Sequence, residues 1–194
     1  MGTINLFSAI YRPFTHLQRL LLGAILSFIP GLNLFAVGYL LNCIKTRDMP
    51  AWRLKMFLDG LLVIILVLIY AVPALFLFGL VVLLNIPFDS FFIIPFFFLV
   101  GITAYLIPAA IVNYAKTGKL FQGVFTTAFN SYYFVALILG LFWAAILNGL
   151  TFAIIRGLYY VMPLSLYLVM SILITAFFYY ASQISLVTMV AESK

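Results

Sequence analysis

Four acidic residues and one histidine, His16, are the groups that could move protons in this chain of 194 residues. Acid–base catalysis needs such groups within reach of a substrate, and metal or nucleophilic chemistry needs them at characteristic spacings. The sequence has no paired carboxylates, metal-ligand cluster, nucleophile motif or glycine-rich phosphate loop, and its lone Cys43 has no partner for an intramolecular disulfide. It therefore predicts a protein that is not an enzyme and binds no cofactor or metal.

The polar residues that could contact a partner lie around two basic stretches. Asp59 is the acid at the mouth of an apolar run, and Lys55 precedes it by one helical turn, where the two could pair. A facing Asn130 could also satisfy Asp59. We expect these polar groups to lie at one membrane face. The candidates for contact with a partner or a lipid headgroup are Lys55, Asp59, Asn113 and Asn130.

A transporter would need polar groups along a path through the bilayer. The candidates for such a path are Asn33, Asn42, Asn113, Asn148 and Gln183. Charge would be a stronger indication, because a charged side chain at the bilayer centre costs about 2.5–3.5 kcal/mol on insertion scales. The interiors of the apolar runs contain none. Scattered amides and small residues such as Gly140 and Gly149 are more typical of helix–helix contacts.

The composition places these residues in a bilayer. Hydrophobic residues make up 67% of the chain, and the apolar runs are continuous, which favours helices over the alternating pattern of a β-barrel. The net charge of +6 would suggest nucleic acid as the partner of a soluble protein. In a membrane protein we interpret the basic residues as topology signals and headgroup contacts, so no nucleic acid is expected.

The sequence predicts one all-α integral membrane domain over residues 1–194, a polytopic bundle of transmembrane helices. Residues 1–19 are expected to form an interfacial segment and not a cleaved signal peptide. Four full spans are predicted at 58–84, 91–114, 132–155 and 164–190. An interfacial amphipathic helix is predicted before the third full span, with its apolar face formed by Leu120, Phe121, Val124, Phe125, Ala128 and Phe129.

Residues 20–43 allow two topologies, because Pro30 lies at the centre of this apolar stretch. Proline lacks a backbone donor, so the stretch is either one kinked span or a re-entrant helical hairpin. With the hairpin, one side of the membrane holds Arg12, Arg19, Lys45, Arg47, Arg53, Lys55, Lys116, Lys119 and Lys194, and only Arg156 lies on the other side. A single crossing moves Arg12 and Arg19 to the side of Arg156.

The positive-inside rule favours the hairpin and sets the orientation. The basic loops 44–57 and 115–131 and the C-terminus are expected in the cytoplasm, in a cytoplasmic membrane. An internal repeat argues for the single crossing instead, because Asn42, Lys45 and Asp59 align with Asn113, Lys116 and Asn130. That alignment lays residues 20–43 over the spanning 91–114. Both topologies stay open at this point.

Several short motifs follow one another over residues 15–190. They are Ile29-Pro30 with Asn33, Gly38-Tyr39-Leu40, Pro50-Ala51-Trp52, Asp59-Gly60, Ile107-Pro108-Ala109-Ala110, Asn113-Tyr114 and Gly118. The series resembles a prokaryotic multi-pass membrane family classed as a domain of unknown function. The turn at Trp52 departs from that family, since Arg53 and Lys55 make it basic where the family tends to be acidic. The resemblance implies the multi-pass topology and no activity.

The function predicted from the sequence is that of an accessory, scaffold or assembly subunit of a larger membrane complex. Its expected partners are membrane lipids and other membrane subunits or a second copy, because 21 Phe and 12 Tyr provide broad apolar surfaces. A scaffold should form a closed bundle with a large apolar face. The alternative is a small-solute or lipid transporter or channel, with a polar cavity near the midplane lined by Asn33, Asn42, Asn113 or Asn148.

Overall fold

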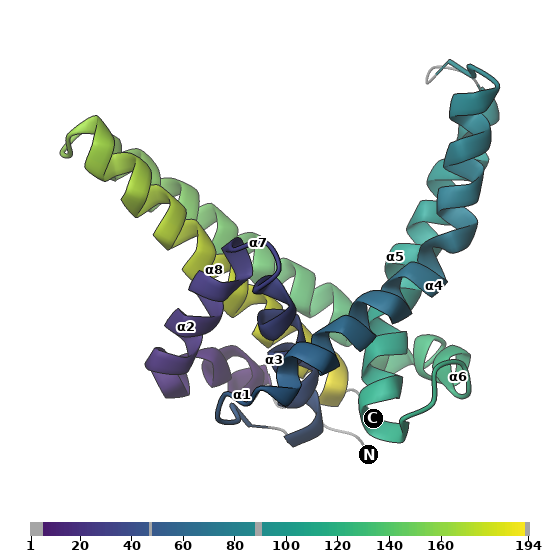
Figure 1. The fold of residues 1–194 in the computed structure, drawn as a ribbon, viewed down its shortest axis with the longest axis horizontal. Helices are drawn as coiled ribbons and strands as arrows, with labels where there is room; N and C mark the ends of the chain where they lie inside the picture. The colour runs from purple at the N-terminus through teal and green to yellow at the C-terminus, as the bar shows by residue number, and fades with distance from the viewer. Residues whose placement is uncertain (1–5, 47, 88–90, 193–194) are drawn as a thin grey trace.

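A computed structural model describes residues 6–46, 48–87 and 91–192 (Figure 1). Arg47 and Lys194, which enter the charge argument, lie outside the described residues, as do residues 1–5 of the N-terminal segment. The helices are α1 (Leu6–Tyr11), η1 (Arg12–His16), α2 (Leu17–Phe28), α3 (Asn33–Thr46), α4 (Lys55–Leu83), η2 (Phe91–Ile93), α5 (Ile94–Thr117), α6 (Val124–Ala128), α7 (Ser131–Tyr159) and α8 (Leu164–Glu192).

The all-α, multi-pass membrane class is confirmed. Within the described chain, the helices long and apolar enough to cross a membrane are α4, α5, α7 and α8. Each corresponds to a predicted span, with ends shifted by a few residues. The predicted span 91–114 begins with the short η2 turn, and its main helix α5 continues to Thr117, where Gly118 in the left-handed conformation (φ 70°) caps it.

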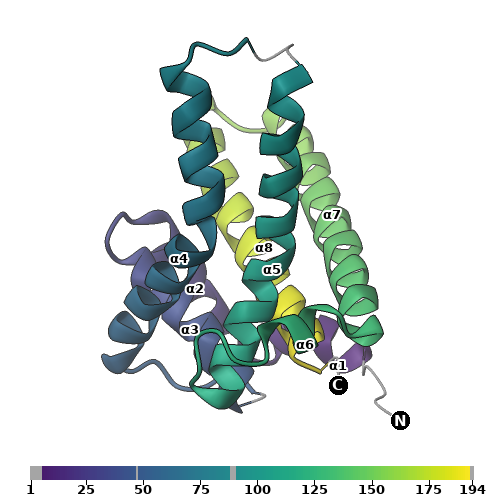
Figure 2. The ribbon, with the colours of Figure 1, turned by 90° about the vertical axis from the view of Figure 1, so that its right-hand side faces the viewer.

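The four long helices form two hairpins that diverge from a common base (Figures 1 and 2). One arm consists of α4 and α5 and the other of α7 and α8, and α5 contacts α8 near the base. The shorter helices α1, α2, α3 and α6 lie at this base. The expectation of a closed bundle is wrong, because the arms separate towards their far ends and leave the molecule V-shaped.

Buried tyrosines join the elements of the base. The hydroxyl of Tyr180 in α8 donates to the Ala36 carbonyl in α3 at 3.0 Å. The hydroxyl of Tyr133 in α7 donates to the Tyr105 carbonyl in α5 at 2.6 Å. Gly23 in α2 leaves room for the Tyr180 ring, since a Cβ there would lie 2.0 Å from Cε1. The short helices therefore share one core with the long ones.

Two glycines bring the backbones of α3 and α4 into contact. A Cβ on Gly38 or Gly60 would lie 1.8 or 1.9 Å from a main-chain carbonyl oxygen of the other helix. Beside this contact, the Tyr39 ring stacks on Trp52, with 4.3 Å between the ring centroids. Three of the short sequence motifs therefore meet in one helix–helix contact.

Pro30 lies between two separate helices. α2 ends at Phe28 and α3 begins at Asn33, whose N–H donates to the Ile29 carbonyl at 3.0 Å. Gly31 makes the turn in the left-handed conformation (φ 82°). The helices have 12 and 14 residues, fewer than the roughly 20 that a full span requires. The single kinked helix that one topology assumed is not formed, and α2 packs against α3.

The predicted amphipathic helix is shorter than expected. Its helical part is α6, because Gly118 and Gly123 adopt left-handed conformations (φ 70° and 87°) that interrupt a helix. Val124 is buried, whereas Phe125 and Phe129 are exposed. The apolar face that the spacing predicted is therefore divided between the core and the outer surface.

The internal repeat stays a prediction. In both copies a threonine hydroxyl donates to the carbonyl of the asparagine four residues earlier, Thr46 to Asn42 at 2.9 Å and Thr117 to Asn113 at 2.8 Å. The helices that carry these pairs differ, with 14 residues in α3 and 24 in α5.

Candidate functional site

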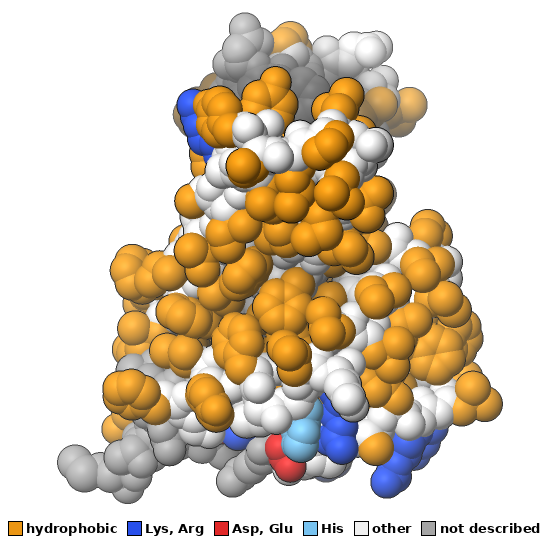
Figure 3. Space-filling model, turned by 90° about the vertical axis from the view of Figure 1, so that its left-hand side faces the viewer, with side chains coloured by type: hydrophobic (Ala, Val, Ile, Leu, Met, Phe, Trp, Pro, Cys, Tyr) orange, Lys and Arg blue, Asp and Glu red, His pale blue; other side chains and the backbone are white. Residues whose placement is uncertain are grey.

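Charged side chains gather at the base of the molecule (Figure 3). Arg12 forms an ion pair with Glu192 at 2.9 Å, which joins η1 to the end of α8. Arg19 donates to the carbonyl of Met49, in the segment before α4. Arg156 lies near the far end of α7. Further basic residues lie at the ends of helices: Lys45 in the last turn of α3, Lys116 in the last turn of α5, Lys55 at the start of α4, and Arg53 and Lys119 in the adjoining segments.

Asp59 is buried in the contact between α3 and α4. Asn42 Nδ2 donates to its Oδ2 at 2.8 Å, and Lys45 Nζ lies 3.8 Å from its Oδ1. Lys55 is exposed. The predicted Lys55–Asp59 pair is therefore wrong: across the close helix contact, Asp59 reaches the side chains of α3. Asn130 does not satisfy Asp59 either, because it caps α7.

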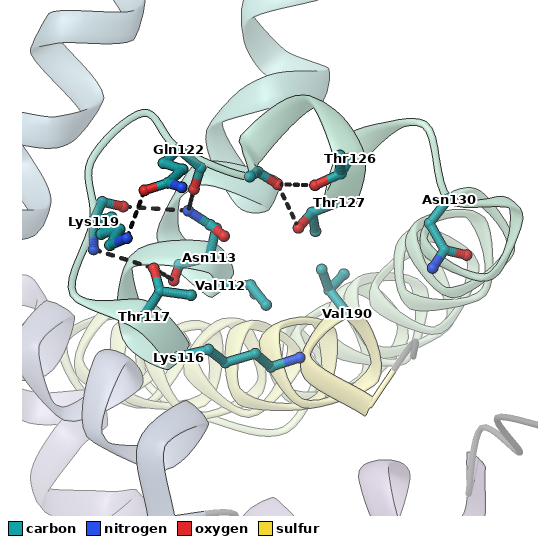
Figure 4. Close-up of a pocket in the computed structure, with 11 residues that line it drawn as sticks. Val112, Asn113, Lys116, Thr117, Lys119, Gln122, Thr126, Thr127, Asn130 and Val190 are labelled. Carbon is teal, nitrogen blue, oxygen red and sulfur yellow. Dashed lines mark hydrogen bonds between the residues drawn. The ribbon is translucent and has the colours of Figure 1, made fainter.

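A polar pocket of about 410 Å³ opens at the base (Figure 4). Its walls come from the end of α5, the loop that follows, α6, the residue before α7 and the end of α8. The lining residues are Val112, Asn113, Lys116, Thr117, Lys119, Gln122, Gly123, Thr126, Thr127, Asn130 and Val190. Segments from both arms of the molecule therefore contribute to one pocket.

Asn113 organises the loop that forms one wall. Its side chain is buried, and Nδ2 donates to the carbonyls of Lys119 at 3.2 Å and Gln122 at 2.8 Å. The hydroxyls of Thr126 and Thr127 donate to a main-chain carbonyl at the start of α6, at 2.8 and 2.9 Å. These bonds fold the loop back over the end of α5 and hold the polar groups around the pocket (Figure 4).

The pocket carries cations and hydrogen-bond donors. Lys119 Nζ donates to the neutral side-chain oxygen of Gln122 at 2.6 Å, and Lys116 Nζ donates to the Ala191 carbonyl in α8. None of the residues that line it is acidic, histidine or cysteine. Nor do the described residues contain a group of three or more His, Cys, Asp or Glu suited to a metal ion. The arrangement is suited to an anion with several acceptor oxygens.

Asn113 and Asn130, two of the four predicted contact residues, line this pocket, whereas Lys55 and Asp59 do not. Asn130 has a second role, because its Oδ1 accepts the Tyr132 N–H at 2.9 Å and caps α7. Lys116 and Lys119, which also line the pocket, are not among the predicted site residues, because their charge is interpreted as a topology signal. Their closeness to Asn113 along one polar loop was the signal that could have identified them.

The asparagines proposed for a transport path lie in different settings. Asn33 is exposed at the start of α3, and Asn42 is bound to Asp59. Asn148 is exposed on α7 and donates to the Ala144 carbonyl of its own helix at 2.8 Å. None of these three side chains lines the pocket around Asn113.

An apolar cavity of about 200 Å³ lies where the two arms meet. α3, α4, α5 and α8 contribute aliphatic side chains to its wall, and Gln183 is a polar residue beside them. Val112 and Val190 line both this cavity and the polar pocket, so the two spaces adjoin. Ile107 also lines an apolar groove of about 320 Å³ between α4 and α5, which extends the apolar surface along that arm.

Comparison with known proteins identifies a family for most of this architecture. The model of a family described as "Protein of unknown function (DUF4013)" matches residues 22–156, from within α2 to near the end of α7. The matched region includes Asp59, Asn113 and Asn130. No curated protein and no solved structure matches the chain.

Proposed function

We propose that this chain, which belongs to the DUF4013 family of unknown function, is an accessory or scaffold subunit that holds a partner membrane protein between its arms. In place of the closed bundle expected from the sequence, the divergence of two apolar hairpins from one base carries the proposal (Figure 1). Large apolar side chains stay exposed along both arms, such as Phe76 (69%) and Phe152 (66%). In a bilayer, such surfaces are covered by lipid or by the helices of another subunit.

The groove on the α4–α5 arm favours a helix as the occupant. Small side chains line it at Ala71, Ala74, Thr103 and Ala104, and small residues let a neighbouring transmembrane helix approach closely. It starts at Ile107, beside the cavity where the arms meet, so it follows the arm upward from the base.

The other arm has both used and open small residues. Gly140 is packed against Leu186 of α8, where an added Cβ would lie 2.4 Å from that side chain. Gly149, further along the same helix, has no atom within 4 Å of such a Cβ. On α7, Gly140 thus packs against α8 near the base, and Gly149 is open to a partner beyond it.

The proposal places the base in the cytoplasm of a prokaryotic cell and makes α2 and α3 a re-entrant hairpin. Arg12 and Arg19 precede α3, Lys45 lies in its last turn, and all three lie at the base. Because the α2–α3 pair begins and ends at the same end of the molecule, it enters and leaves by one face. The distribution of charge around the base supports the cytoplasmic side through the positive-inside rule.

The proposed subunit has no catalytic step and binds no nucleic acid. In support, Asp59 accepts a hydrogen bond from Asn42, and Glu192 pairs with Arg12, so each of these acids has a structural partner.

The transporter alternative is less well supported, since Asn33 and Asn148 are exposed at separate places. It would be favoured by solute uptake into vesicles that contain the purified protein alone.

An obstruction in the groove tests the scaffold proposal. Ala104 is exposed, so Ala104→Phe can be accommodated by the chain itself while it fills the groove. The measurement is the amount of membrane partner, or of a second copy, that co-purifies in mild detergent and is quantified by mass spectrometry. Because overpacking costs about 1–3 kcal/mol, we expect at least about a fivefold loss of the partner.

The matched control is Ile102→Phe, on the side of α5 that faces Phe125 and Phe129. It adds an aromatic ring to the same helix outside the groove, so the partner should be retained. An equal loss with both variants, or a wild-type protein that purifies as a monomer without any partner, would reject the proposal.

A further inference from the structure

We propose that the base holds a binding site for an anionic phospholipid, beyond the scaffold function proposed above. The geometry is that of two adjoining spaces of opposite character: a cationic polar pocket of about 410 Å³ and an apolar cavity of about 200 Å³. Val112 and Val190 lie in the walls of both. The polar space suits an anionic, oxygen-rich head, and the adjoining apolar space suits a hydrocarbon chain of the same ligand.

The polar pocket supplies the partners that a phosphodiester head requires. Lys119 lies on the exposed loop, and its ammonium group donates to a neutral amide oxygen of Gln122. Exchange of that neutral acceptor for a phosphate oxygen gives the ammonium group an anionic partner, which adds the attraction of opposite charges to the hydrogen bond. Asn130 contributes its amide at the opposite wall, since only its oxygen is used to cap α7 (Figure 4). Basic pockets between transmembrane helices commonly bind anionic headgroups.

The apolar cavity is suited to the first part of an acyl chain. Aliphatic side chains from α3, α5 and α8 surround it, including Leu40, Ile111 and Val187. An apolar cavity of about 150 Å³ already takes up a molecule of the size of benzene. A space of about 200 Å³ with an almost wholly aliphatic lining therefore has room for a hydrocarbon segment.

The position of α6 places the polar pocket at headgroup depth. Phe125 and Phe129 are 60% and 83% exposed and stack on one another, with 6.4 Å between their centroids. Thr126 and Thr127 of the same short helix line the pocket. Aromatic residues are enriched at the membrane–water interface. α6 thus presents rings to the lipid and lines the pocket with two hydroxyls that donate to the Gly123 carbonyl.

Lipid titration of the full-length, delipidated protein in detergent tests the site. The probes are mixed micelles with phosphatidylglycerol, mixed micelles with phosphatidylcholine, and glycerol 3-phosphate or inorganic phosphate alone; the readouts are native mass spectrometry and the midpoint of thermal unfolding. We expect phosphatidylglycerol to bind most tightly and to raise the midpoint. Lys119→Gln should weaken its binding about fivefold, the effect of one lysine near an anionic lipid.

Lys55→Gln is the matched control, because Lys55 is an exposed lysine at the same base and lines neither space. It should leave the affinity unchanged, as should Ala104→Phe, which separates this site from partner binding. An equal loss with Lys55→Gln overturns the assignment of the site. Equal binding of phosphatidylcholine overturns the anionic head, and equal binding of free phosphate shows that the pocket takes a soluble anion instead.

Discussion

Asp59 accepts a hydrogen bond from Asn42 and lies 3.8 Å from Lys45, so its charge is balanced inside the α3–α4 contact. The sequence places Asp59 correctly at the mouth of a long apolar run but assigns it the wrong partner. A spacing of four residues favours Lys55, yet that rule describes a single exposed helix. The neighbouring helix decides the pairing, because the backbones of α3 and α4 are in contact and this brings Asn42 and Lys45 of α3 to the carboxylate.

Removal of this carboxylate should destabilise the protein. Asp59→Ala leaves one N–H of Asn42 without its acceptor in a buried contact, and we expect a loss of about 1–3 kcal/mol in the free energy of unfolding. Lys45→Ala should cost less than about 1 kcal/mol, because Lys45 is 35% exposed and its distance to the carboxylate is long. Reversible unfolding in mixed detergent micelles measures both. Equal losses would show that the ion pair, and not the amide bond, dominates.

The helices α3 and α4 can approach closely because two glycines at their contact have no side chain. Gly38 and Gly60 occur in motifs that indicate a resemblance to a family but predict no helix contact. In the structure they allow two backbones to touch, which no larger residue permits. Likewise, Gly123 interrupts the segment for which a longer amphipathic helix is predicted, since its φ of 87° is incompatible with a continuous helix.

Gly60→Ala should disrupt the α3–α4 contact. The new Cβ would lie 1.9 Å from a carbonyl oxygen of α3, so the helices must move apart, at a cost of about 1–3 kcal/mol or more. Gly79→Ala is the control in the same helix, because a Cβ there has nothing within 4 Å and alanine favours helix by up to about 1 kcal/mol. The comparison uses thermal unfolding of the purified variants. A Gly60→Ala protein as stable as Gly79→Ala would contradict the close approach.

At the scale of the whole molecule, the base collects residues that are far apart in the chain. The ion pair between Arg12 and Glu192 and the bond from Lys116 to the Ala191 carbonyl connect the N-terminal segment and α5 to the end of α8. These contacts place the ends of both hairpins at one level. Beyond this level the arms separate, which gives the V shape its open side (Figure 1).

Cysteine labelling from each side of the membrane tests the proposed topology. Phe7→Cys and Lys55→Cys should react with an impermeant maleimide from one side, and Val161→Cys, in the turn between α7 and α8, from the other. The native thiol is a silent background, because Cys43 is buried and buried structural cysteines are inert. Labelling of Phe7→Cys from the Val161 side would establish the single crossing.

The sequence by itself determined the class of protein, the four long membrane helices and the break at Pro30. These features follow from local properties: the length of an apolar run, the missing donor of proline and the conformational freedom of glycine. The tertiary structure alone decided the V-shaped arrangement, the Lys45–Asp59 pair, and the meeting of the Asn113 loop with α7 and α8 in one pocket. Helix–helix contacts select these partners, because apolar residues insert into the bilayer on any face of a helix, whereas the face that packs depends on the shape of its neighbours.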